Sequence, residues 1–434
     1  MSPTMIGVTA FVILFALMAA GMPIGFAMAL VGFVGYVFLG GIGGALSTLA
    51  TTPFDSVSSY TLTVIPLFVL MGELAAAAGL IRGAYSSAQK WLGWLPGGLS
   101  IATIGACAAF AAVCGSSLAT GGAMTSIAYP EMKKYNYDSR LATGCIAAGG
   151  TLGILIPPSV VFIMYAIFAE ESIGRLYMAG FIPGILLAVL FMIAIYIQCK
   201  ANPALGPRGP KSGWIERLIS LKDTIPVLLL AFIVLGGIWG GIFTPNEAAG
   251  VGVIVAFIMG LIARKFTLKN ITHSLMETIS ISAMIYVILI GAMIFNYFIV
   301  LTGIPNELSV LVKGLAVPKE GILAAILFIY LILGCLMDSF AMTVLTLPIF
   351  LPILASIGYN FVWFGVIFVI MIEMAGITPP VGMNVFVVAG MVREVPMYTI
   401  FRGVIPFFLA MIVCIVLLIA FPQIAMILPN TMIK

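Results

Sequence analysis

The sequence predicts an all-α polytopic membrane protein made of two inverted repeats, each with a re-entrant hairpin and a broken helix. Three observations support this fold class. Of the 434 residues, 62% are hydrophobic and 8% are charged, whereas about 25% of a typical soluble domain is charged. The stretches 5–54, 91–130 and 141–169 contain no Asp, Glu, Lys or Arg. Prolines also recur at one fixed offset between the two halves. A water-soluble fold is therefore excluded.

Two apolar runs, 4–20 and 24–40, predict the first membrane spans, because a spanning helix needs about 20 apolar residues. No basic segment precedes the first run, so a cleavable signal peptide is not predicted. Residues 41–59 are expected to form an external loop, and residues 60–80 a third span.

Residues 97–132 are predicted to form a re-entrant hairpin, which enters and leaves the membrane on the same side. Most of this stretch is uncharged, and both flanks carry basic residues of the kind found on the cytoplasmic side. The turn is expected within VCGSSLATGG (113–122), where small polar residues cluster.

The apolar run 139–169 contains GGTLGILIPPSV (149–160), with two adjacent prolines near its middle. Proline lacks a backbone donor, and a membrane segment must satisfy its hydrogen bonds internally. The run therefore predicts a helix broken inside the membrane, although a proline pair alone could also mark only a kink. A span at 173–199 completes a first repeat of residues 1–200, and the Pro/Gly-rich segment 201–222 is predicted to be a cytoplasmic linker.

The second half, 223–434, repeats landmarks of the first at an offset of 222 residues. The matched residues are Pro23 and Pro245, Pro96 and Pro318, Ser117 and Ser339, Pro130 and Pro352, Pro157 and Pro379, and Pro158 and Pro380. This offset predicts a second hairpin at 319–356, on the external side, and a second broken helix at 360–392. Because the first hairpin opens to the cytoplasm, the halves are expected to be inverted. Inverted repeats with discontinuous helices are typical of secondary transporters, whose sites lie at the breaks.

Basic residues predict the orientation, because cytoplasmic loops are enriched in Lys and Arg. The side of the membrane with more basic residues is assigned to the cytoplasm. Its basic residues are Arg82, Lys90, Lys133, Lys134, Arg140, Lys200, Arg208, Lys211, Arg217, Lys222, Arg264, Lys265, Lys269, Arg393 and Arg402. The other side keeps Arg175, Lys313, Lys319 and Lys434. Both termini are thereby predicted to be external.

An interrupted helix exposes unpaired carbonyls at one end and unpaired N–H groups at the other. Carbonyls and hydroxyls suit a hard cation such as Na⁺, whereas helix N-termini suit a carboxylate. The predicted Na⁺ ligands are Gly115, Ser116, Ser117, Thr151 and Gly153 in the first half and Asp338, Ser339, Gly376 and Thr378 in the second. The predicted substrate contacts are Ser117, Thr120, Pro158, Phe340, Pro380 and Asn384.

Acidic side chains inside a membrane are costly and usually functional. The second half supplies Asp338 and Glu373, and Asp338 could ligate Na⁺, carry a proton or cap a helix near the external surface. Interfacial or interhelical polar contacts are expected instead for the acids nearer the ends of predicted spans, Glu73, Glu247 and Glu277.

Other kinds of chemistry lack the residues they need. The sequence has no GxxxxGK[ST] loop, so the chain is not expected to use ATP. His273 is the single histidine, and the six cysteines are scattered without a CxxC pair. We therefore predict neither an enzyme nor a bound cofactor, and a membrane anchor of a redox enzyme is disfavoured. Nucleic-acid binding is implausible for so apolar a chain.

Several segments resemble the large membrane (permease) subunit of the tripartite ATP-independent periplasmic (TRAP) transporters, the DctM-like family of the ion transporter superfamily. These segments are GMPIGFAMALVG, CGSSLATGGAMTSIAYPEMKKYNYD, GGTLGILIPPSVVFIMYA, TPNEAAGVGV and MAGITPPVGMNVFVVAG. The resemblance extends over nearly the whole chain.

The resemblance implies import of an organic acid, typically a carboxylate, across the bacterial inner membrane, driven by a Na⁺ gradient. It implies an elevator mechanism, in which hairpins and broken helices move as a transport domain against a scaffold. Family Na⁺ sites correspond to positions 115–120, 151–158, 337–343 and 376–380. The implied partners are a small four-helix membrane subunit and a periplasmic substrate-binding protein. The alternative is a stand-alone ion-coupled organic anion symporter or exchanger.

Overall fold

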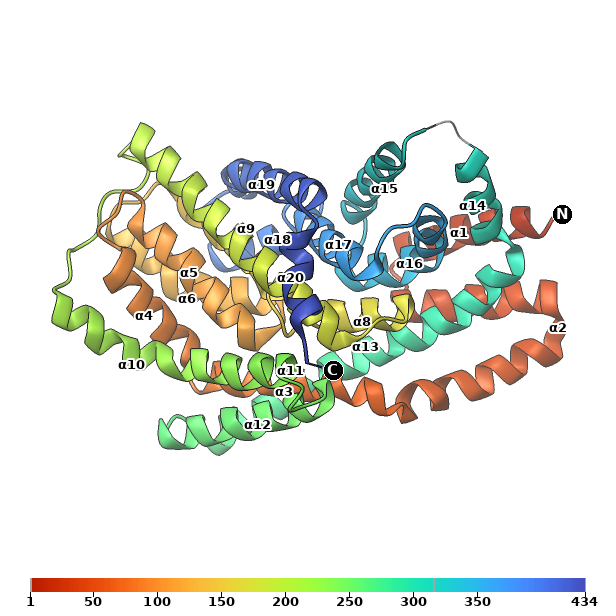
Figure 1. The fold of residues 1–434 in the computed structure, drawn as a ribbon, viewed down its shortest axis with the longest axis horizontal. Coiled ribbons are helices and arrows are strands. Elements are labelled where there is room, and N and C mark those ends of the chain that lie inside the picture. The colour runs from red at the N-terminus through yellow and green to blue at the C-terminus, as the bar shows by residue number, and fades with distance from the viewer. Residues whose placement is uncertain (1, 315–316, 434) are drawn as a thin grey trace.

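The computed structural model describes residues 2–314 and 317–433, and every regular element in that part of the chain is a helix (Figure 1). Within these described ranges, eight helices are long and apolar enough to cross a membrane, and the bent pair Ser139–Leu155 and Val160–Ala169 makes a ninth candidate. The predicted class, an all-α polytopic membrane protein, is confirmed.

The helices of the first half are α1 (Pro3–Ala19), α2 (Ile24–Ser58), the short 3-10 helix η1 (Tyr60–Thr63), α3 (Val64–Ala77), α4 (Leu80–Leu92), α5 (Gly98–Cys114), α6 (Ser117–Lys134), α7 (Ser139–Leu155), α8 (Val160–Ala169) and α9 (Ile173–Ala201). Those of the second half are α10 (Trp214–Ala231), the π-helical η2 (Phe232–Gly236), α11 (Gly237–Trp239), α12 (Pro245–Ile262), α13 (Leu268–Thr302), α14 (Ile304–Gly314), α15 (Lys319–Gly334), α16 (Ser339–Ser356), α17 (Phe361–Gly376), α18 (Met383–Met391), α19 (Met397–Ala420) and α20 (Gln423–Thr431). Residues 214–222 of the predicted linker are the start of α10.

The prediction of a loop at 41–59 is wrong, because α2 continues as a helix to Ser58. Only Gly41, with φ +79°, leaves the helical conformation, and glycine adopts this conformation without a steric penalty. Large apolar side chains beyond this kink are exposed, among them Ile42 and Phe54. An apolar surrounding favours a helix there, because a helix satisfies its own backbone hydrogen bonds.

Both predicted hairpins are helix pairs with short turns. Gly115 ends α5 with φ +68°, and Ser116 then caps α6 by accepting a hydrogen bond from Ala119 N at 3.3 Å. The second turn is capped in the same way by Asp338, at the start of α16. Side-chain oxygens of Ser and Asp are favoured at this position because they satisfy free N–H groups of the first helical turn.

Both predicted broken helices are interrupted at their proline pairs. α7 and α8 are bent by 44° at their break, and α17 and α18 flank the second proline pair. The Pro157–Pro158 and Pro379–Pro380 peptide bonds are both cis. α6 and α16 begin at Ser117 and Ser339, 222 residues apart, which is the predicted offset. The inverted orientation of the two halves stays a prediction.

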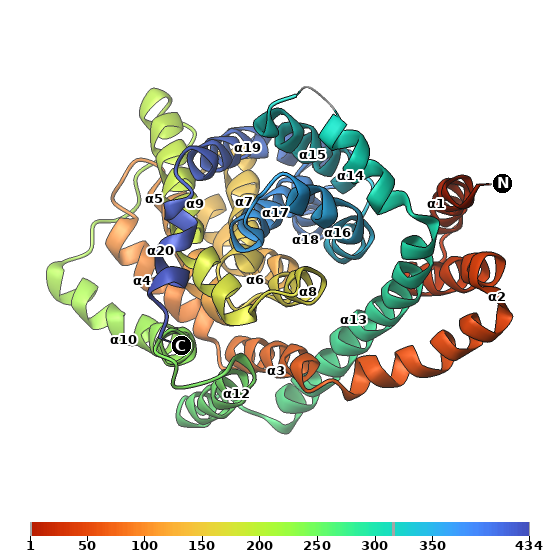
Figure 2. The same ribbon diagram turned by 45° about the vertical axis from the view of Figure 1, so that its right-hand side comes forward.

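The hairpins and broken helices pack together in the middle of the molecule. Figure 2 shows α6, α7, α8, α16, α17 and α18 gathered beside the long helix α13, which packs along α2. Each half contacts the other through these elements, because α18 packs on α6 and α16 packs on α8. Helix ends from both halves are thereby brought to one place.

Candidate functional site

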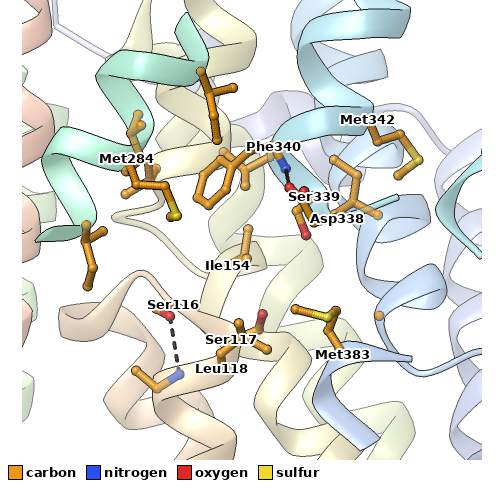
Figure 3. Close-up of a pocket in the computed structure, with 18 of the residues that line it drawn as sticks. Ser116, Ser117, Leu118, Ile154, Met284, Asp338, Ser339, Phe340, Met342 and Met383 are labelled. Atoms are coloured by element: carbon orange, nitrogen blue, oxygen red, sulfur yellow. Dashed lines mark hydrogen bonds between the residues drawn. The ribbon is translucent and has the colours of Figure 1, made fainter. Parts of the chain in front are cut away.

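A cavity of about 780 Å³ lies where the two hairpin turns and the two helix breaks meet. One wall comes from the start of α2 and from α3 and α13, and the other from the turns and breaks. Figure 3 shows Ser116 and Ser117 of one turn and Asp338 and Ser339 of the other on opposite sides of Ile154. The cavity therefore lies between the long outer helices and the discontinuous ones.

The first hairpin turn lies directly against the first break. A Cβ atom on Gly153 would lie 2.5 Å from the carbonyl oxygen of Ser116 and 2.8 Å from Thr120 Oγ1. A Cβ atom on Gly115 would lie 2.8 Å from the carbonyl oxygen of Pro158. Glycine at both positions thus permits a contact between two backbones that a side chain would prevent.

The second hairpin turn lies against the second break in a similar way. A Cβ atom on Gly334, the last residue of α15, would overlap with the Cβ of Ala375 near the end of α17. Asp338 Oδ1 accepts hydrogen bonds from Phe340 N at 2.8 Å and Ala341 N at 3.0 Å. The helix cap considered for Asp338 is therefore present, and its second carboxylate oxygen makes none of these capping bonds.

The predicted site residues divide into two groups. Those that line the cavity are Gly115, Ser116, Ser117, Asp338, Ser339, Phe340, Gly376 and Asn384. Those outside the cavity lining are Thr120, Thr151, Gly153, Pro158, Thr378 and Pro380. The three threonines donate their hydroxyl protons to carbonyls three or four residues earlier in the chain, those of Ser116, Ala148 and Met374. Their oxygen lone pairs can still accept a cation or a hydrogen bond.

The two breaks differ in exposure. Pro157 and Pro158 are buried, whereas Pro379 and Pro380 are exposed. Pro380 is outside the cavity lining, whereas Val381 and Gly382 directly after it, and Asn384 on α18, belong to the lining. The equivalence of the two proline pairs in sequence does not extend to their surroundings.

Four carboxylates line the cavity, and they belong to Glu73, Glu277, Asp338 and Glu373. Among the described residues, the lining contains no Lys or Arg. Glu73 and Glu277 come from α3 and α13, where only interfacial or interhelical contacts were expected. Sequence position placed them near span ends, and the fold turns them toward the cavity. The cavity is consequently an acidic, mostly apolar chamber suited to cations.

A multi-pass helical membrane protein whose discontinuous helices end around one central cavity belongs to the class of secondary transporters. The family model "Tripartite ATP-independent periplasmic transporter, DctM component" matches residues 11–424. The chain therefore belongs to the DctM component family of TRAP transporters, which is a family of transporter components and not of enzymes.

Curated relatives agree with this family over most of their length. The C4-dicarboxylate TRAP transporter large permease protein DctM of Pseudomonas aeruginosa is 34% identical, with 90% of this chain and 93% of the relative covered. The sialic acid TRAP transporter large permease protein SiaM of Vibrio cholerae is 30% identical, with 95% and 96% covered. The isethionate TRAP transporter permease protein DctMQ of Oleidesulfovibrio alaskensis is 33% identical, with 94% and 64% covered.

Two solved structures share the fold. The YdaH transporter of Alcanivorax borkumensis matches with a TM-score of 0.65 and 16% identity, covering 89% of this chain and 90% of that one. MtrF of Neisseria gonorrhoeae matches with a TM-score of 0.59 and 13% identity, covering 88% and 85%. At these identities the likeness concerns the fold alone.

Proposed function

We propose that this chain is the large membrane subunit of a tripartite transporter that imports an organic acid together with Na⁺. The observation that carries the proposal is the meeting of two hairpin turns and two helix breaks at one acidic cavity, in a chain of the DctM family. The curated relatives are named for C4-dicarboxylates, sialic acid and isethionate. All of these are organic acids, which sets the proposed substrate class.

Sodium coupling is proposed because the described lining of the cavity contains no basic side chain to hold an anion. Its lining contains carboxylates, hydroxyls and free helix ends. An acid anion entering an acidic cavity needs bound cations to offset the repulsion between like charges. The proposed ligands are the predicted residues of the two turns and breaks, with Na⁺ as the coupling ion. Substrate would then lie between Ser117 and Asn384, beside Phe340.

An elevator movement is proposed from the position of the cavity. The cavity lies between α2, α3 and α13 on one side and the turns and breaks on the other. The discontinuous helices of both halves contact each other through α6 with α18 and α8 with α16. They could therefore move together as a transport domain, while the long outer helices remain as the scaffold.

The proposed partners are a small membrane subunit and a periplasmic substrate-binding protein, as in the tripartite family. The chain covers 64% of the relative named DctMQ, which leaves room in that protein for a fused small subunit. The proposed location is the bacterial inner membrane, with both termini on the periplasmic side.

Reconstitution with defined components tests this function. Proteoliposomes would receive the chain alone, the chain with its small subunit, or both with the binding protein outside, and uptake of radiolabelled organic acids would be measured. We expect uptake only with all three components. Uptake by the chain alone would contradict the tripartite function and favour a stand-alone symporter or exchanger.

A further inference from the structure

We propose that Arg217 and the tryptophans around it form a binding site for the phosphate group of an anionic phospholipid. The site lies where α10 packs against α4 (Figure 1). Its members are Trp91 and Trp94, at the end of α4 and in the turn after it, and Trp214 and Arg217, at the start of α10. We call these four residues the tryptophan–arginine cluster. None of the four lines the central cavity, so the site is separate from the proposed transport site.

The guanidinium group of Arg217 lies over two indole rings. Its Cζ atom is 5.3 Å from the centre of the Trp214 ring and 6.0 Å from that of Trp94. A guanidinium within about 6 Å of an indole face is attracted by the electrons of the ring. Such stacking uses the flat face of the guanidinium and leaves the N–H groups at its edge free to donate. Arg217 is therefore oriented without losing its capacity to bind an anion.

The tryptophans of the cluster are themselves held in place. Trp91 Nε1 donates to the carbonyl oxygen of Arg217 at 3.1 Å, and Trp94 Nε1 donates to that of Trp91 at 3.0 Å. The rings of Trp91 and Trp214 meet edge to face, with centroids 6.4 Å apart. The cluster thus connects the end of α4 to the start of α10 as a preformed unit.

The charge of Arg217 has no counter-charge in the described part of the chain. Its hydrogen bonds there all use its backbone, and its carbonyl oxygen also accepts from Ser220 Oγ at 2.6 Å. Its Nε atom is buried and has no hydrogen-bond partner. The adjacent acid, Glu216, accepts instead from Gly213 N at 3.3 Å. Because an unpaired charged donor is costly, an anionic oxygen from outside the chain would stabilise this arrangement.

The start of α10 also has a surface suited to lipid. The segment Trp214–Trp239 is one of the candidate membrane spans. Its exposed large apolar side chains begin in the first helical turn and include Ile215, Leu218, Ile219, Ile225, Leu228 and Phe232. Arg217 therefore lies at the end of a span, the level at which tryptophans gather beside lipid headgroups.

The local charge favours an anionic headgroup. Residues 200–223 contain five basic and two acidic side chains, and basic segments next to a span attract anionic lipids. A guanidinium matches phosphate in particular, because two parallel N–H groups can donate to two of its oxygens. Free inorganic phosphate has the same headgroup chemistry, but it has no acyl chains for the apolar surface of α10. We therefore assign the site to a lipid such as phosphatidylglycerol.

Binding of radiolabelled phosphatidylglycerol to the purified full chain in detergent tests the site. Unlabelled phosphatidylglycerol, phosphatidylcholine and inorganic phosphate serve as competitors. Arg217→Gln removes the charge, whereas Arg217→Lys keeps the charge and removes the planar group. Arg402→Gln is the matched control, because Arg402 lies over a single ring, that of Tyr398 at 5.6 Å, near the start of another candidate span. Each variant is first checked for a monodisperse elution profile.

We expect unlabelled phosphatidylglycerol to displace the label from wild type at lower concentration than phosphatidylcholine or inorganic phosphate does. Arg217→Gln should weaken the tightest lipid site by about tenfold or more, because hydrogen bonds to a charged group are lost. Arg217→Lys should also weaken it, since an ammonium group neither stacks nor pairs with two oxygens in the same way. Arg402→Gln should bind like wild type.

Four results would overturn the proposal. Equal losses in Arg217→Gln and Arg402→Gln, or wild-type affinity in Arg217→Lys, would mean that net charge alone attracts the lipid. Displacement by inorganic phosphate as readily as by phosphatidylglycerol would assign the site to a free anion. Equal competition by phosphatidylcholine would leave the cluster as a surface for contact with another protein. If Arg217→Gln does not fold, unchanged affinity in Trp214→Ala overturns the site.

Discussion

Lys133 Nζ lies 2.6 Å from Glu394 Oε2 and connects α6 of the first half to the segment that follows α18 of the second. The hydroxyl of Tyr129 donates to the same carboxylate at 2.8 Å. These contacts lie beside the packing of α6 on α18, through which the first hairpin meets the second broken helix. Side-chain contacts at the surface thus accompany the packing of the two halves.

The stability that this ion pair contributes to the folded state should be small and should depend on pH. Hydrogen bonds from Lys133 and Tyr129 lower the pKa of Glu394 below its ordinary value. A lowered folded-state pKa gives stability that is present above the unfolded pKa, about 4.3 for Glu, and lost as the pH falls through the folded value. Both side chains are largely exposed, so the contribution is expected to be small and reduced by salt.

Thermal unfolding of Glu394→Gln in detergent checks this dependence. At pH 7 and low salt the variant should unfold slightly below wild type, and the difference should shrink as the pH falls below about 4. A difference that grows as the pH falls would contradict a stabilising effect of the ionised Glu394 carboxylate.

Gly153→Ala should separate the first turn from the first break. Its Cβ would lie 2.5 Å from the Ser116 carbonyl oxygen, and overpacking of this kind costs about 1–3 kcal/mol. We expect a lower unfolding midpoint and loss of Na⁺-dependent uptake. Gly121→Ala on α6 is the control, because its Cβ would have a single neighbour at 3.9 Å. Comparable uptake by both variants would argue against a functional contact at Gly153.

Asp338→Asn separates helix capping from Na⁺ binding. Asn caps a helix about as well as Asp, whereas Ala costs about 0.5–2 kcal/mol at this position. Asp338→Asn should therefore fold like wild type but need about tenfold or more Na⁺ for half-maximal uptake. Ser117→Ala makes the corresponding test at the other turn. Unchanged Na⁺ titrations in both variants would remove these residues from the proposed Na⁺ sites.

Gly291→Ala should loosen the crossing of α2 and α13. Its Cβ would overlap with the backbone carbonyl of Gly25, and a Cβ on Gly25 would lie 2.6 Å from the Val287 carbonyl oxygen. The expected loss of stability is about 1–3 kcal/mol, read as a lower midpoint in thermal unfolding. Gly250→Ala on α12, which has nothing within 4 Å of its Cβ, should leave the midpoint unchanged or raise it. A stable Gly291→Ala would mean that the two helices can move apart at little cost.

Local sequence signals coincide with the interruptions of the helices. The proline pairs at Pro157 and Pro379 interrupt helices in the structure, and Ser116 and Asp338 cap the helices that follow the two turns. Each of these features follows from the chemistry of one or two residues. A missing N–H or a capping oxygen changes the backbone hydrogen bonds only within the adjacent helical turn.

Features that depend on distant contacts were not predictable from single positions. Residues 41–59 were expected to form a loop, but the chain has only one kink, at Gly41, within a longer helix. Glu73 and Glu277 were placed near span ends, and their position on the cavity wall depends on how α3 and α13 pack. The contacts of α6 with α18 and of α16 with α8 join segments far apart in sequence.

Na⁺-driven uptake is the measurement that tests the central claim most directly. Proteoliposomes holding the chain and its small subunit, with substrate-loaded binding protein outside, would be exposed to an inward Na⁺ gradient, to equal Na⁺, or to an equal gradient of K⁺. We predict accumulation of the organic acid above equilibrium only with the inward Na⁺ gradient. Accumulation of the same size without that gradient would contradict Na⁺ coupling at the cavity.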